Sequence, residues 1–68
     1  MIQITSDTTN AEIIQHIYTN VEKARGANFL IGFTTALVDG LASRNKKESR
    51  EYLEQTYQQS INLLMQTK

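Results

Sequence analysis

The sequence lacks several features that small proteins use to stay folded. It contains no cysteine, no proline and one histidine among its 68 residues. A disulfide framework is therefore excluded, and a closed histidine–cysteine metal site lacks its ligands. A chain of this length buries only about 60% of the surface that its unfolded form exposes. Regular helix packing and association between chains remain as the means of stabilising its core.

Neither sign of charge predominates, because seven Lys or Arg residues balance seven Asp or Glu residues. A neutral chain has no overall field that attracts nucleic acid or an anionic membrane, and near-neutral chains associate more readily than highly charged ones. We therefore expect a protein partner, with a homodimer as the first choice, while nucleic acid stays open as a second. No apolar run reaches the roughly 18 residues of a membrane span, and the first ten residues lack the pattern of a secretory signal. We expect a cytoplasmic protein that does not bind membranes.

The hydrophobic pattern predicts an all-α fold in one domain over residues 1–68. Alternation of apolar and polar residues at the start predicts a short extended arm or half-buried strand over residues 1–8, carried by Ile2 and Ile4. Three helices are predicted to follow, over residues 9–25, 28–44 and 46–66. We expect them to form a helical hairpin or three-helix bundle that dimerisation completes.

Capping residues set these boundaries. Thr9 is followed three positions later by Glu12, and Asn45 is followed by Glu48, so each pair predicts a capping box at a helix start. The remaining boundary is the junction between the first two helices. There Gly26 is predicted to end the first helix, and Asn28 is predicted to cap the second.

Apolar residues recur at spacings of three and four in the first and third helices, which places them on one face of each helix. The predicted core residues of these two helices are Ile13, Ile14, Ile17, Val21, Ala24, Leu53, Tyr57, Ser60, Ile61 and Leu64. The second helix is apolar around more of its circumference, with Ile31 and Val38 opposite the main face. We therefore predict that it is the central helix, packed by more than one neighbour.

Small residues recur every four positions along the second helix, at Gly32, Ala36 and Gly40. They predict a groove that another helix can approach closely, either within the chain or from a second chain. Two interior glycines each cost about 1 kcal/mol relative to alanine, so a close contact is expected to offset them. The predicted partner or dimer interface comprises Phe29, Gly32, Phe33, Ala36, Leu37, Gly40 and Leu41. It would act by burying an apolar helix face against another chain.

No set of side chains predicts catalysis. General acid–base chemistry needs two titratable groups held close together, and the sequence offers only His16 one helical turn after Glu12. Two ligands are too few for a closed metal site. Asp39 is interpreted either as a solvated edge residue or as a polar residue that sets the register of a partner helix. We expect no enzymatic activity, no cofactor and no metal.

One basic cluster lies at the junction of the second and third helices. Its members are Arg44, Lys46, Lys47 and Arg50. Such a cluster could contact phosphates. The alternative is a solvated face of ion pairs at spacing i to i+4, because Lys47 precedes Glu51 by four residues and Arg50 precedes Glu54 likewise.

The order of an arm and two helices resembles the ribbon-helix-helix family of dimeric repressors over Ile2 to Leu41. Gly26-Ala27-Asn28 is similar to the Gly-x-Ser/Thr/Asn turn of that family, and Phe33, Ala36 and Leu37 fall at its core positions. The resemblance implies a strand that pairs with its twin across a dimer and presents polar side chains to the DNA major groove. A DNA-binding regulator is therefore the alternative to a protein-interaction module.

Overall fold

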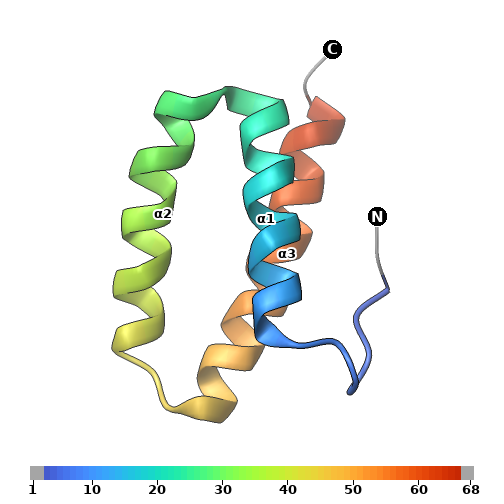
Figure 1. Cartoon of the computed structure of the whole chain (residues 1–68), viewed down its shortest axis with the longest axis vertical. Helices are drawn as coiled ribbons and strands as arrows, with labels where there is room; N and C mark the ends of the chain where they lie inside the picture. The colour runs from blue at the N-terminus through green and yellow to red at the C-terminus, as the bar shows by residue number, and fades with distance from the viewer. Residues whose placement is uncertain (1–2, 67–68) are drawn as a thin grey trace.

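In a computed structural model, which describes residues 3–66, this chain folds into three α-helices without a strand in that range (Figure 1). The helices are α1 (Asn10–Arg25), α2 (Ala27–Ala42) and α3 (Lys46–Gln66). The predicted all-α fold is therefore confirmed. Residues 3–9 precede α1 as an arm that turns where the Thr8 amide donates to the Thr5 carbonyl at 3.1 Å. Ile2 of the predicted arm lies outside the described residues.

Both predicted cap residues are confirmed, and the reciprocal capping box is complete at Asn45 and Glu48. The Thr9 hydroxyl accepts a hydrogen bond from the Glu12 amide at 3.2 Å and also donates to the Glu12 carboxylate. At α3, the Asn45 side-chain oxygen accepts from the Glu48 amide at 2.9 Å, while the Asn45 amide donates to the Glu48 carboxylate at 3.2 Å. These bonds satisfy amide groups that have no partner within the first turn of a helix.

The start of α2 differs from the prediction, because Asn28 lies inside the helix and does not cap it. Gly26 is the single residue between α1 and α2, and its φ is +87°, a conformation that residues with a side chain rarely adopt. Its amide donates to the Glu22 carbonyl at 2.8 Å, and its carbonyl accepts from the Leu30 amide at 3.2 Å. Since one glycine makes the whole reversal, α2 begins directly after it. The other end of α2 falls two residues before the predicted Arg44.

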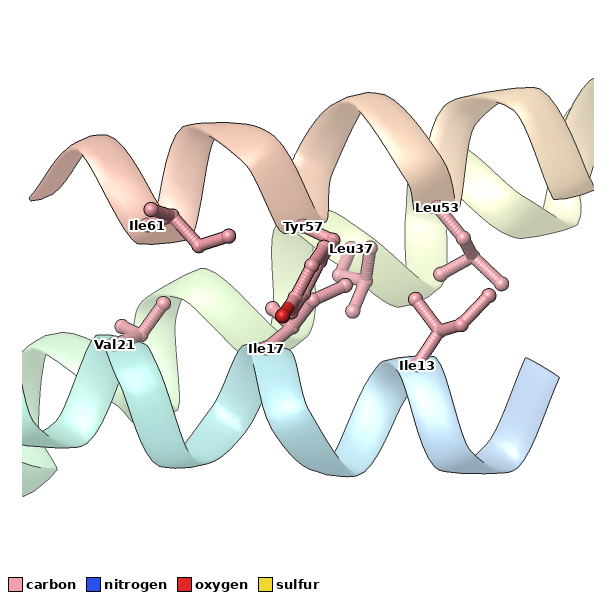
Figure 2. Close-up of a cluster of buried hydrophobic side chains, with 7 residues drawn as sticks. All are labelled: Ile13, Ile17, Val21, Leu37, Leu53, Tyr57 and Ile61. Carbon is pink, nitrogen blue, oxygen red and sulfur yellow. The ribbon is translucent and has the colours of Figure 1, made fainter. Parts of the chain in front are cut away.

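The core lies mainly between α1 and α3. Six of its seven buried apolar side chains come from these two helices, and Figure 2 shows the two sets facing each other. The seven are Ile13, Ile17, Val21, Leu37, Leu53, Tyr57 and Ile61. A polar contact joins the same helices, because the Asn20 side-chain amide donates to the Ser60 hydroxyl at 3.1 Å, and that hydroxyl donates to the Tyr57 carbonyl. The predicted main faces of both helices are thus buried.

The prediction that the second helix is central was wrong. α1 occupies that position: it has its most extensive contact with α3 and a smaller one with α2, whereas α2 and α3 touch least. α2 stands to one side in Figure 1, joined to the rest by two short turns. It buries only Leu37 fully, while Leu30, Phe33 and Leu41 are partly buried against the core. Because α3 packs on α1, the part of the wide apolar arc of α2 that carries Phe29, Ile31 and Val38 stays exposed.

Candidate protein-binding surface

The exposed side of α2 is the candidate site, because it gathers the exposed large apolar side chains. Phe29 is 46% exposed, Ile31 67% and Val38 54%. Among the described residues, only Met65 of α3 is another large apolar residue with comparable exposure. We define the α2 outer surface as the exposed residues Asn28, Phe29, Ile31, Gly32, Thr35, Ala36, Val38 and Asp39.

This surface belongs to the helix with the fewest charges. Asp39 is the only charged residue among the 16 of α2. An exposed helix normally carries charged residues on its solvent side and keeps its apolar residues for the core. In this chain the helix with the least charge also buries the fewest side chains. An exposed apolar patch of this kind typically marks a site of interaction with another protein.

The seven residues predicted as an interface divide into two groups. Four of them face the chain itself: Leu37 is 2% exposed, Phe33 and Leu41 are partly buried against the core, and Gly40 lies against α3. The other three, Phe29, Gly32 and Ala36, are exposed.

Ile31 and Val38 were absent from the predicted interface but lie on the α2 outer surface. Their positions toward the other side of the helix from its main apolar face were the signal that could have identified them. Two apolar residues spaced by seven on the far side of a helix indicate a second contact face.

The two glycines of the predicted groove differ, because only Gly40 makes a close contact within the described chain. A Cβ atom added to Gly40 would lie 2.8 Å from the ring of Tyr52 on α3, so Gly40 makes a close contact within the chain. A Cβ atom added to Gly32 would meet no atom of residues 3–66 within 4 Å. The internal contact therefore explains Gly40 and leaves Gly32, which costs helix stability, without an intramolecular reason.

Phe29 is held at the corner between α1 and α2. The Arg25 guanidinium lies 5.8 Å from the centre of its ring, and the ring stacks on that of Phe33 with centroids 6.4 Å apart. A cation over an aromatic face and a stacked pair each favour one ring orientation. Phe29 is therefore an exposed apolar side chain of the outer surface whose ring contacts Arg25 and Phe33.

Arg50, a member of the predicted basic cluster, binds the N-terminal arm. Its guanidinium donates to the carbonyls of Thr5 at 2.9 Å and Thr8 at 2.6 Å, and to the Asn10 side chain at 2.9 Å. It also forms the predicted ion pair with Glu54 at 3.0 Å. The planar guanidinium fork can reach several acceptors at once. These donors are consequently occupied within the chain.

Arg44 is likewise engaged internally. Its guanidinium lies 4.2 Å from the centre of the Tyr52 ring and donates to the Gly40 carbonyl at 2.7 Å. Lys46 and Lys47 remain exposed at the start of α3. The predicted basic cluster therefore has three exposed members, Arg44, Lys46 and Lys47, and both of its arginines also contact other parts of the chain.

A shallow polar hollow of about 480 Å³ lies beside Arg44. Its lining residues are Ser43, Arg44, Glu48, Glu51, Tyr52 and Gln55. Within residues 3–66 the predicted pair of Lys47 with Glu51 does not come within ion-pair distance, whereas Arg50 with Glu54 does. Arg44 is the only cation of the lining and has Glu48 and Glu51 beside it, so the lining does not favour an anion.

The candidate catalytic residues are not brought together. The His16 ring meets Tyr57 edge-on at 6.5 Å, and the Glu12 carboxylate interacts with the Thr9 hydroxyl of the capping box. Asp39 is exposed on α2. The part of the chain that the structure describes holds no group of three or more His, Cys, Asp or Glu residues arranged for a metal ion. Nor does it contain a helix with the length and hydropathy to cross a membrane.

Comparison of this chain with models of protein families, with curated proteins and with solved structures finds no match.

Proposed function

We propose that this chain is a small protein-interaction module that binds another protein chain through the α2 outer surface. The observation that carries the proposal is that α2 has the least charge of the three helices and also the least burial. Covering exposed apolar side chains stabilises a complex by about 25 cal/mol for each Å² removed from water. Phe29, Ile31 and Val38 supply that area, and we expect a partner that offers a complementary apolar helix face.

The alternative of a DNA-binding regulator is less favoured by the geometry. Arg50 gives its donors to the arm, to Asn10 and to Glu54. The exposed Arg44 stacks on Tyr52 and donates to the Gly40 carbonyl, and Lys46 and Lys47 are the other exposed cations of the cluster. Residues 3–9 form no strand, and the main face of α1 packs against α3. A ribbon-helix-helix dimer would need its strand free to pair with a second copy. Phosphate contacts dominate DNA affinity, so three exposed cations with Glu48 and Glu51 beside Arg44 support only weak binding.

Site-specific photo-cross-linking tests the proposal. A photoreactive amino acid is placed at Ile31 or Val38 of the full chain and, as a matched control, at Gln58 on the exposed side of α3. After illumination in cells that produce the protein, we expect discrete adducts of defined mass from the two α2 positions and none of the same mass from Gln58. Identical adducts from all three positions, or none from α2, would contradict the proposal.

A further inference from the structure

The most outward line of α2 is built from small and polar residues. Asn28, Gly32, Thr35 and Asp39 are spaced by four, three and four positions, so they form one stripe opposite the buried Leu37. Larger apolar side chains flank this stripe, with Phe29 on one side and Ile31 and Val38 on the other. Gly32 lies within the stripe and has open space beside it. A second helix could approach most closely at this glycine.

Two opposite charges lie at equal distances from Gly32 along the sequence. Arg25 precedes Gly32 by seven residues and Asp39 follows it by seven. Both are exposed, and in residues 3–66 neither lies within ion-pair distance of an opposite charge. Arg25 stands over Phe29, at the start of α2. The surface therefore carries a positive group near one end and a negative group near the other.

This arrangement is complementary to itself in one orientation. If a second copy crosses α2 antiparallel with Gly32 against Gly32, its Asp39 lies about 10 Å from the crossing at a rise of roughly 1.5 Å per residue. It lies toward the end of α2 where Arg25 stands over Phe29. Two-fold symmetry repeats the same pair on the other side. A parallel arrangement would instead place like charges at the same level. The distribution of charge thus selects the antiparallel pair.

We propose that the occupant of the α2 outer surface is a second copy of this chain, bound antiparallel about Gly32 with two Arg25–Asp39 ion pairs. This inference rests on the proposed function. A helix of 16 residues is about 24 Å long and about 10 Å wide, a footprint of roughly 240 Å². A standard stable interface covers about 800 Å² on each partner. The dimer is therefore weak and dissociates on dilution.

A charge-reversal cycle tests this pairing with the full chain. Sedimentation and light scattering measure the dimer dissociation constant of the natural protein, of Arg25→Glu, of Asp39→Arg and of the double variant. Each single reversal opposes two symmetric pairs, so we expect the dissociation constant to rise at least about tenfold. The double variant exchanges the charges and is expected to return to within about threefold of the natural value. Lys47→Glu, away from α2, serves as the control and leaves association unchanged.

Circular dichroism confirms folding for each variant, and Asp39→Asn supplies a milder change that removes the charge without reversing it. A natural chain that stays monomeric up to about 1 mM, beyond the range of weak specific complexes, overturns the pairing. Single reversals that leave association unchanged, or a double variant as weak as either single one, also overturn it. If α2 cross-links to a heavier protein while the chain is monomeric, the proposed function stands and only the self-pairing fails.

Discussion

The α1–α3 pair and α2 differ in how their apolar side chains are covered by neighbouring helices. α1 and α3 each present one narrow apolar stripe, and both carry many charged or polar residues elsewhere. A single neighbour covers such a stripe, and Asn20 with Ser60 adds a polar contact across it. α2 has a wide apolar arc, one charge and no side-chain cap. The comparison shows that a high apolar content does not ensure burial, because burial requires neighbours on every apolar side.

Core truncation is expected to give the largest effect that separates the two regions. Leu53 of α3 is 1% exposed, so Leu53→Ala removes buried methyl groups and leaves a cavity, at a cost of about 2–5 kcal/mol in the free energy of unfolding. Ile31→Ala on the outer surface of α2 is expected to change it by less than about 0.5 kcal/mol in the monomer. Urea denaturation at low protein concentration measures both. Equal losses would mean that α2 is as deeply packed as α3.

Loss of the Arg50 contacts is expected to release the arm without opening the helices. Arg50→Ala deletes two hydrogen bonds to the arm and one to Asn10 at the start of α1, and we expect a loss of about 1–2 kcal/mol, because freeing the arm also restores conformational entropy. Arg50→Lys keeps the charge but lacks the fork, so it should rescue only part of the loss. Hydrogen exchange should become faster at the amides of Thr5 and Thr8, and stay slow in α1. Faster exchange throughout α1 would instead make the arm part of the core.

Local signals were sufficient to predict much of the fold. Spacings of three and four identified the buried faces of α1 and α3, and the pairs Thr9–Glu12 and Asn45–Glu48 identified their starts, because these interactions span one helical turn. The contacts of Arg50 with Thr5 and Thr8 join residues more than forty positions apart. No local pattern encodes such contacts, so the sequence did not reveal that Arg50 of the basic cluster binds the arm.

The position of α2 could not be predicted for a related reason. Its wide arc suits two neighbours, but the sequence does not state whether α3 packs on α2 or on α1. Gly40 and Gly32 illustrate the result, since they share one helix and a similar pattern, and only Gly40 meets a neighbour. Whether α3 packs on α1 or on α2 decides which residues form the candidate site. Once α3 lies on α1, Leu37 becomes buried and Ile31 becomes exposed.

Capping should also distinguish the helices. Thr9→Ala and Asn45→Ala each remove a side-chain acceptor from a helix start, so each is expected to lower the free energy of unfolding by about 1 kcal/mol. Asn28 caps nothing in α2, and Asn28→Ala is expected to be neutral or slightly stabilising because alanine has the higher helix propensity. Thermal unfolding measures all three variants. A loss at Asn28 equal to that at Thr9 would contradict the observed start of α2.

The two glycines of α2 give the smallest but sharpest comparison. At protein concentrations where the chain is monomeric, Gly32→Ala is expected to stabilise it by about 0.5–1 kcal/mol, because the added Cβ meets open space. Gly40→Ala is expected to gain less or to lose stability, since the Tyr52 ring, which also stacks with Arg44, must shift to admit the Cβ atom. In a Tyr52→Ala background the two substitutions should give equal gains, as a double-mutant cycle in urea would measure. Equal gains in stability with Tyr52 in place would contradict this expectation. They would show that the Tyr52 ring can shift at no cost in free energy, so that its contact with Gly40 does not constrain α2.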